Sequence, residues 1–165
     1  MELRMAQEKD YTQIAEMKWL HCEEDDADYN TTNLVGVDKN KFLEEFIEFL
    51  NEHKEYKVFV ASDNDVVISS MFVYIIPKTP KPNRKQKYIS YLTNVYTLKE
   101  YRNNKIGTEL LTYIKEYVAK EDCELMFVWP SENSVNWYAR NDFKLENEIL
   151  ECSLENQEIT TGEIK

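Results

Sequence analysis

Glycine is scarce in this sequence, with three residues among 165, and proline is only slightly more common with four. This scarcity excludes collagen-like chains and glycine-rich or proline-rich low-complexity chains. Cysteine is limited to Cys22, Cys123 and Cys152, an odd number of widely separated residues that indicates neither a disulfide framework nor a metal site. A chain of this length can bury a core without such staples. We therefore expect one folded domain in the reducing cytoplasm, with no bound metal.

Long apolar runs and excess positive charge are also missing. No stretch approaches the roughly 18 apolar residues of a membrane-spanning helix, and no basic segment precedes an apolar run near the start. We therefore expect neither export nor membrane insertion. The formal net charge is −11. Nucleic acids and anionic membranes are bound through excess Lys and Arg, so this charge disfavours both as partners and favours a positively charged one.

What the sequence does contain is an alternation of helical and extended patterns. Apolar residues at helical spacing predict helices over 9–22, 39–54, 107–120 and 133–140. Apolar, aromatic and β-branched runs predict strands over 2–6, 56–62, 66–76, 88–98, 124–129 and 143–154, with a tight hairpin turn at 63–65. No repeat or linker divides the chain. We predict an α+β fold, a mixed central sheet flanked by helices, in a single domain over 1–155 with a polar tail over 156–165.

Residues 101–111 join the long strand-like run to the third helical run. The strand pattern of 88–98 is aromatic and β-branched, without Gly or Pro. After Gly107, apolar residues follow the spacing of one helix face: Leu110, Leu111, Ile114, Tyr117 and Val118. The helix therefore begins inside the turn. Its first amide groups lack partners within the helix and carry the positive end of the helix dipole, which favours binding of a pyrophosphate.

These residues resemble those of a known family. Arg102–Gly107 is similar to the Arg/Gln-x-x-Gly-x-Gly/Ala signature of the GNAT superfamily of acetyl-coenzyme A-dependent N-acetyltransferases. Residues 131–143 resemble the later family segment in which a Tyr, here Tyr138, lies five residues before a Phe. With the opening 3–11, the similarity covers nearly all of 1–155 and implies a mostly antiparallel sheet. Two positions depart from the pattern, because Lys105 and Asp142 stand where the family usually has glycine.

The resemblance implies acetyl-coenzyme A as cosubstrate and a place for it. The pantetheine arm is expected to pair with the backbone at the end of the long strand, at Tyr96, Thr97 and Leu98. The pyrophosphate is expected on the loop formed by Arg102, Asn103, Asn104, Lys105, Ile106, Gly107 and Thr108. Asn133 has two interpretations, as a cap of the short helix or as a hydrogen-bond partner of the pantetheine arm.

Acetyl transfer to an amine needs a neutral amine, a polarised carbonyl group and a proton for the leaving thiolate. Tyr138 aligns with the family Tyr that is commonly proposed to supply this proton. The alternative is an ordinary core aromatic beside Trp137. No general base is evident, since 88–98 contains no Asp, Glu or His, and a water molecule is the expected intermediary. His21 and His53 are interpreted as ordinary surface or boundary residues.

Residues 23–28 contain five carboxylates and are expected to form an acidic segment after the first helix. The family places the acceptor near this segment, so a cationic amine is one expectation and a solvated loop is the alternative. The predicted function is acetyl transfer to a primary amine of a small molecule or peptide, by direct attack in a ternary complex. The alternatives are a non-catalytic acyl-coenzyme A sensor and an interaction module of the same fold. The acceptor and the oligomeric state, including a homodimer, remain open.

Overall fold

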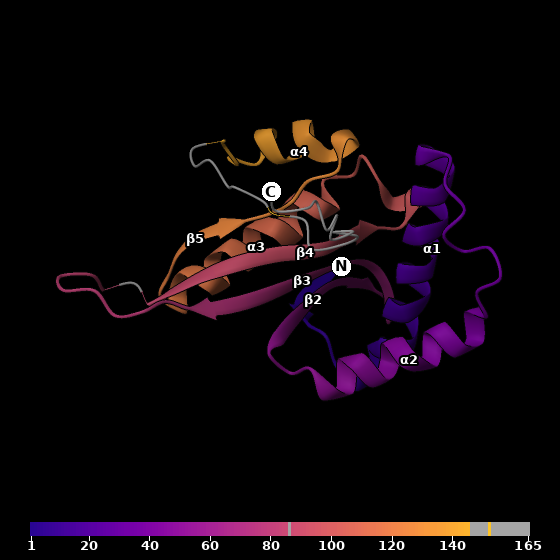
Figure 1. Cartoon of the computed structure of the whole chain (residues 1–165), viewed down its shortest axis with the longest axis horizontal. Coiled ribbons are helices and arrows are strands. Elements are labelled where there is room, and N and C mark those ends of the chain that lie inside the picture. The colour runs from indigo at the N-terminus through magenta and orange to yellow at the C-terminus, as the bar shows by residue number, and fades with distance from the viewer. Residues whose placement is uncertain (86, 146–151, 153–165) are drawn as a thin grey trace, which may run out of the picture.

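A computed structural model of the chain describes residues 1–85, 87–145 and 152 (Figure 1). Its described strands are β1 (Glu2–Met5), β2 (Tyr56–Asp63), β3 (Val66–Pro77), β4 (Tyr88–Thr97) and β5 (Cys123–Phe127). Its described helices are α1 (Tyr11–Tyr29), α2 (Lys39–Glu52), α3 (Ile106–Lys120) and α4 (Val135–Arg140), with single 3-10 turns at Glu8–Asp10, Lys99–Tyr101 and Glu132–Ser134. The sheet runs β1-β2-β3-β4-β5 and is antiparallel except for the parallel pair β4–β5. The predicted α+β class is confirmed.

Helices cover both faces of this sheet, which explains why β2 and β3 are apolar almost throughout. Phe59 and Met71 pack in the core that α3 covers, whereas the neighbouring Val60 and Phe72 pack in the core beneath α1 and α2. Side chains alternate between the faces of a strand, so a sheet buried on both sides needs apolar residues at successive positions. Figure 1 shows α1 and α2 on one side of the strands and α4 on the other.

An extra residue in β4 changes which side chains reach each face. Ser70 pairs with Tyr96 and Phe72 pairs with Thr93, so β4 advances three residues where β3 advances two. Asn94 lies in this bulge with a φ of 48°. The bulge breaks the alternation: Leu92 belongs to the core beneath α3, but Tyr96, four residues later, belongs to the core beneath α1. β4 therefore turns the ring of Tyr96 toward α1.

Helix α1 is longer than the sequence pattern predicted. The acidic residues 23–28 continue the helix as its last turns, so their interpretation as a separate segment after residue 22 is wrong. Asn30, at φ 52°, ends the helix in the left-handed conformation. The carboxylate of Asp26 then holds the following loop, accepting hydrogen bonds from the Thr31 hydroxyl at 2.6 Å and the Leu34 amide at 3.0 Å. These bonds fix the direction of the chain toward α2.

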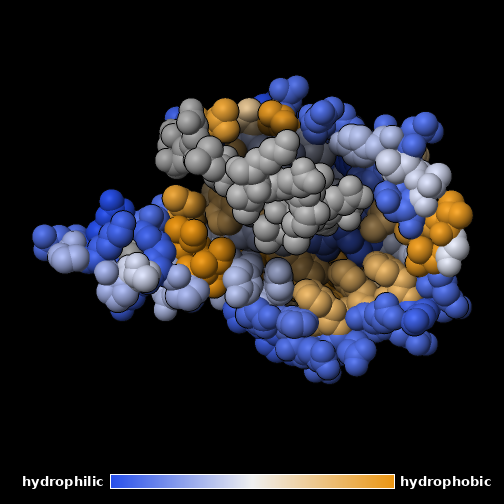
Figure 2. Space-filling model, in the orientation of Figure 1, coloured by the Kyte–Doolittle hydropathy of each residue, from blue (hydrophilic) through white to orange (hydrophobic). Residues whose placement is uncertain are grey.

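The other predicted elements are confirmed with small shifts at their ends, except the last. Phe143–Leu145 form no strand, and the rest of the predicted strand 143–154, apart from Cys152, lies outside the described residues, as does the polar tail 156–165. Between β3 and β4 the chain extends into a projecting arm, which is hydrophilic on the face seen in Figure 2. Within the described ranges no helix is long and apolar enough to cross a membrane, and no group of metal-ligating side chains is found there.

Candidate functional site

The candidate site lies where β4 and β5 separate. β5 pairs with β4 only at Tyr88, Ser90 and Tyr91, so the outer edge of β4 beyond Tyr91 is unpaired among the described strands. A cavity of about 1290 Å³ opens beside this edge, bordered by α1, the start of α3 and the segment around α4. Figure 2 shows the hollow, with apolar side chains in its floor. An exposed strand edge offers amide and carbonyl groups to an extended ligand.

Most of the predicted site residues meet on the walls of this one cavity. They are Tyr96, Thr97, Arg102, Asn103, Lys105, Ile106, Gly107, Thr108, Asn133 and Tyr138. Leu98 and Asn104 do not line it. The Leu98 amide donates to the Ile68 carbonyl at 3.0 Å, and its side chain packs against the core beneath α1 and α2. Asn104 donates to the carbonyl oxygens of Tyr101 and Arg102, which shapes the loop from within. The sequence pattern predicted the segment that borders the cavity, but it did not show that Leu98 and Asn104 lie outside the cavity lining.

The start of α3 presents free amide groups to the cavity. The Glu109 amide, which bonds the Lys105 carbonyl at 2.9 Å, is the first to find a partner within the helix. The preceding amides of Ile106, Gly107 and Thr108 have no such partner. A Cβ atom at Gly107 would make ordinary van der Waals contacts with Trp137 Cζ2 at 3.4 Å and with Thr97 Oγ1 at 3.5 Å, so a side chain longer than that of alanine would meet these groups. The arrangement suits an anion approached closely by backbone.

The two positions that depart from the expected glycine pattern both adopt the conformation that glycine favours. Lys105 has a φ of 62° and Asp142 a φ of 66°. A residue with a Cβ atom enters this left-handed region at a steric cost. The backbone at Lys105 and at Asp142 therefore has the conformation that a glycine would adopt there.

The guanidinium group of Arg102 joins the loop to α1 and β4. It donates from Nε to the Thr97 carbonyl at 2.9 Å and from its terminal nitrogen to Glu24 at 2.7 Å, and it lies over the Tyr96 ring at 5.2 Å. The Tyr96 hydroxyl donates to the other Glu24 oxygen at 2.6 Å. Burial would raise the pKa of Glu24, but these hydrogen bonds and the charge of Arg102 lower it. Burial, and then Glu24 itself, raises the pKa of Tyr96.

Tyr138 lies on α4 with 6% of its surface exposed and still reaches the cavity wall. Its ring packs edge-on against Trp137 and Phe143, with centroids 4.9 and 5.3 Å away. No described residue makes a hydrogen bond with its hydroxyl group. Burial, with a smaller contribution from Tyr91, raises the pKa of Tyr138 to about 12. The phenol therefore keeps its proton at neutral pH and can donate it to a ligand.

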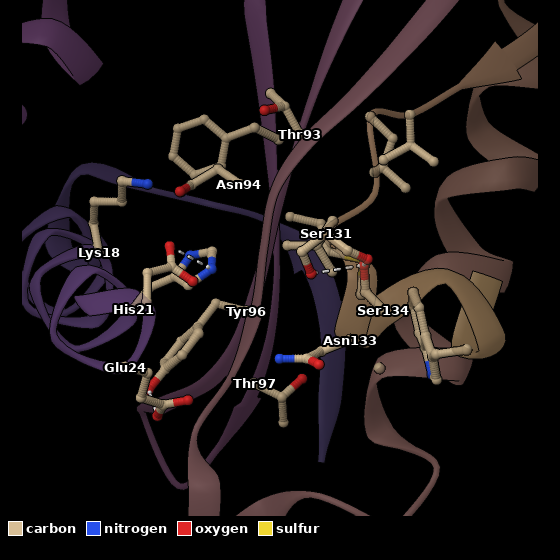
Figure 3. Close-up of a pocket in the computed structure, with 18 of the residues that line it drawn as sticks. Lys18, His21, Glu24, Thr93, Asn94, Tyr96, Thr97, Ser131, Asn133 and Ser134 are labelled. Atoms are coloured by element: carbon tan, nitrogen blue, oxygen red, sulfur yellow. Dashed lines mark hydrogen bonds and ion pairs between the residues drawn. The ribbon is translucent and has the colours of Figure 1, made fainter. Parts of the chain in front are cut away.

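Asn133 does not cap the short helix. Ser134 occupies the N-cap position of α4, and its side chain makes no capping hydrogen bond. The Asn133 amide group instead lies 3.5 Å from Asp28, at the end of α1. Figure 3 shows Asn133, Ser131 and Ser134 across β4 from α1. The capping interpretation is therefore wrong, and α1 approaches the segment before α4 across the cavity.

Among the cavity residues that were not predicted as site residues are His21 and Asn94. Glu24, predicted only as part of the acidic run 23–28, lines the cavity as well, and Figure 3 places His21 and Glu24 on α1 with Asn94 on β4. The His21 ring stacks on Tyr96 at 5.1 Å, so its interpretation as an ordinary residue missed its position. An asparagine within the strand-like run 88–98 could have indicated a bulge at residue 94, because asparagine is depleted in strands and tolerates positive φ.

Comparison with known proteins agrees with this architecture. Residues 11–143 match the model of the acetyltransferase (GNAT) family. A predicted acetyltransferase from Clostridium acetobutylicum, solved with acetyl-CoA, has a TM-score of 0.72 at 20% identity, covering 93% of this chain and 96% of that one. A GCN5-related N-acetyltransferase from Ralstonia eutropha has a TM-score of 0.68 at 17% identity, covering 92% and 97%. An aminoglycoside acetyltransferase from an uncultured soil sample has a TM-score of 0.66 at 16% identity, covering 92% and 93%. No curated protein matches the sequence.

Proposed function

Because the chain belongs to the acetyltransferase (GNAT) family, we propose that it transfers the acetyl group of acetyl-coenzyme A to a primary amine. The observation that carries this proposal is the cavity, which joins an unpaired strand edge, a cluster of free amides and a protonated, buried phenol. One half suits an extended thioester with a pyrophosphate. The other half, between α1 and α2, suits an amine.

The cosubstrate half fits the chemistry of coenzyme A. The pantetheine arm contains two amide groups and can pair with the open edge of β4 at Tyr96 and Thr97, as an added strand would. The pyrophosphate carries negative charge and can accept from the amides at 106–108, beside the ammonium group of Lys105. Arg102 has a different role in this proposal, because Glu24 and the Thr97 carbonyl already hold its guanidinium group. It positions the loop.

The acceptor half combines carboxylates with aromatic side chains. Asp25 and Asp28 line it from α1, and the rings of Phe46, Phe49 and Phe72 line its floor. Carboxylates attract an ammonium ion, and aromatic rings favour an apolar body attached to it. We infer an acceptor that carries a primary amino group on an apolar or partly apolar chain and that is cationic in solution.

In the proposed reaction the amine attacks the thioester directly, without an acetylated enzyme. The nitrogen lone pair forms the bond to the carbonyl carbon, and the carbon–sulfur bond breaks. Tyr138 donates its proton to the leaving thiolate, and a proton released by the amine nitrogen then restores the Tyr138 hydroxyl group. A second proton goes to solvent, so one ammonium ion yields one amide, one thiol and one free proton.

The Tyr138→Phe variant tests this role, because it removes the hydroxyl group and keeps the ring packing. We expect kcat to fall by about 100-fold, as is typical for loss of a general acid, with little change in the affinity for acetyl-coenzyme A. Thiol release is measured with phenethylamine, putrescine, kanamycin and a tripeptide, and binding by calorimetry. The Tyr113→Phe variant is the control, since Tyr113 lies on α3 away from the cavity lining. Equal rates for wild type and Tyr138→Phe would show that Tyr138 has a purely structural role.

A catalytically silent sensor is the second candidate function. It predicts tight binding of acetyl-coenzyme A with no amine-dependent thiol release, and the same two measurements distinguish it from the enzyme.

A further inference from the structure

Two polar side-chain atoms within the described part of the chain are buried and lack a hydrogen-bond partner. They are Nδ1 of His21 and Oδ1 of Asn94. Both residues line the same cavity, His21 from α1 and Asn94 from the bulge of β4. Figure 3 shows both on the α1 side of the strand. Two unsatisfied atoms that belong to residues lining one cavity call for a common explanation.

An unsatisfied buried polar atom costs stability, about 1–3 kcal/mol, so folded proteins rarely keep one without a reason. Asn94 also has a φ of 48°, in the left-handed region that asparagine tolerates. The missing partner of an amide oxygen is a hydrogen-bond donor. A neutral imidazole with its proton on Nε2 also needs a donor at Nδ1. A primary amino group brings several N–H bonds and can serve both atoms at once.

We propose that Nδ1 of His21 and Oδ1 of Asn94 together bind the amino group of the acceptor, and that His21 takes the proton which the ammonium ion must lose before attack. The proposal rests on the proposed function, because it assigns a base to that reaction. Asn94 accepts an N–H bond of the same nitrogen and orients its lone pair toward the thioester. The base therefore comes from α1, and not from the strand before the loop.

The surroundings of His21 favour this role. Nε2 lies 3.6 Å from an Asp25 oxygen, which favours the tautomer with the proton on Nε2 and the lone pair on Nδ1. The ring stacks on Tyr96. Burial lowers the pKa of His21, as do the charges of Lys18 and Arg102, against the opposing effect of Asp25 and Glu24. The imidazole is therefore neutral at neutral pH and able to accept a proton.

The proton balance closes with these residues. The ammonium ion gives one proton to Nδ1 of His21 and becomes a neutral amine. The amine then forms its bond to the carbonyl carbon, the carbon–sulfur bond breaks, and Tyr138 gives its proton to the thiolate. The amide nitrogen loses its extra proton through water, which restores Tyr138, and His21 returns its proton to solvent.

The chain offers a matched control for each residue. It contains only two histidines, and His53 is a partly exposed residue that contacts Glu55. Asn64 also has a positive φ, of 47°, but lies in the β2–β3 turn away from the cavity. We therefore compare His21→Gln with His53→Gln, and Asn94→Gly with Asn64→Gly. Glycine removes the side chain and accepts the positive φ.

The expected results separate the two roles. His21→Gln lowers kcat by at least about 100-fold with the fastest amine of the panel, and it removes the acidic limb of the wild-type pH profile. Asn94→Gly raises KM for that amine by about tenfold. The two control variants stay within about twofold of wild type, and all four keep the thermal stabilisation by acetyl-coenzyme A.

A spectroscopic measurement tests the contact without turnover. The His53→Gln protein has a single histidine, so its ring proton signals in NMR report His21 alone. In the presence of coenzyme A, the panel's fastest amine is expected to shift these signals and to change the pKa they report. Unchanged His21 signals at saturating amine, or full activity in His21→Gln, would overturn the inference and leave the proposed function standing. A wild-type protein that acetylates no amine in the panel would overturn both.

Discussion

Lys105 occupies a backbone conformation that glycine adopts without steric cost. Its φ of 62° places it at the N-cap of α3, where its side chain makes no capping hydrogen bond. A Cβ atom in this region costs roughly 1–2 kcal/mol. The chain accepts this cost in a loop whose free amides face the candidate site, as folded proteins often do at functional positions.

Replacing Lys105 by glycine should therefore stabilise the protein. We expect a gain of about 1 kcal/mol in the free energy of unfolding, the steric relief less the entropy that glycine adds to the unfolded chain. Lys120→Gly, at the regular end of α3, should instead lose about 0.5–1 kcal/mol. Urea unfolding measures both. A loss of similar size in the two variants would show that the Lys105 backbone is not strained.

Asp10 is the most buried charged residue described, with 1% of its surface exposed. Its carboxylate accepts from Arg4 at 2.6 and 3.0 Å and from the Gln7 amide at 2.7 Å. Burial would raise the pKa of Asp10, but the bonds and charge of Arg4, together with the Gln7 amide, lower it. This pair fixes the start of α1 against β1.

The lowered pKa makes stability depend on pH in one direction. The carboxylate stabilises the fold above its unfolded value of 3.8, and this contribution is lost as the pH falls through the lower pKa of the folded state. Asp10→Asn should cost about 3 kcal/mol at neutral pH, because Arg4 is left without its partner, and should flatten the acid limb of the stability curve. Asp63→Asn, at an exposed ion pair, should change little. An acid limb unchanged in Asp10→Asn would contradict this account.

At the scale of elements, the position of the acidic residues 23–28 in the last turns of α1 determines which partners their carboxylates contact. Glu23 accepts from the Trp19 indole at 2.8 Å, Glu24 binds Arg102, and Asp26 holds the loop after the helix. Asp25 lies 3.6 Å from His21 and Asp28 lies 3.5 Å from the Asn133 amide group, so each of the five carboxylates has a neighbouring partner. Only Glu24, Asp25 and Asp28 line the cavity, and of these Asp25 and Asp28 are not bonded to Arg102. Neutralising all five carboxylates would remove structural contacts and cavity charge at once, so an effect on folding could not be separated from an effect on binding.

The sharper test changes Asp28 alone to Asn, because Asp25 also contacts the His21 ring. We expect the KM of a cationic amine to rise by about threefold at low salt and its dependence on ionic strength to weaken, because the carboxylate raises the local concentration of cations. Glu44→Gln on α2 changes the net charge equally and is the control. Steady-state kinetics at two salt concentrations measure both variants. A matching rise in the control variant would assign the effect to net charge alone.

Some features of β4 could be predicted from the sequence and others could not. The run 88–98 was predictable as a strand from its aromatic and β-branched residues, and the loop after it from its turn and helix pattern. The bulge at Asn94 was not, because one inserted residue leaves the composition of a strand unchanged. Yet this residue sends Tyr96 to the α1 face and brings Glu24 and His21 into the site. The contacts of Tyr96 with Glu24 and His21 depend on this bulge and join residues that are far apart in the chain, so no local sequence pattern predicts them.

At the scale of the molecule, the fold follows from a sheet that is apolar on both faces and from the helices α2 and α3, which each have one apolar face. That pattern is local, which is why the class and most element ends were predictable. The length of α1 was not, since its last turns are held by Arg102 and by residues 31–34 and not by an apolar stripe. The roles of Tyr138 and the loop remain predictions, to be decided by chemistry in solution.

The most direct test of the account follows the acetyl group itself. Acetyl-coenzyme A carrying ¹³C at the acetyl carbonyl is incubated with the protein and each amine of the panel, and the labelled carbon is observed by NMR while free thiol is counted. If the protein transfers acetyl groups to amines, the label moves from the thioester to an amide in equal amounts with the thiol released. Label that stays on the thioester, or that appears as free acetate at the same rate with and without amine, would contradict the proposed function.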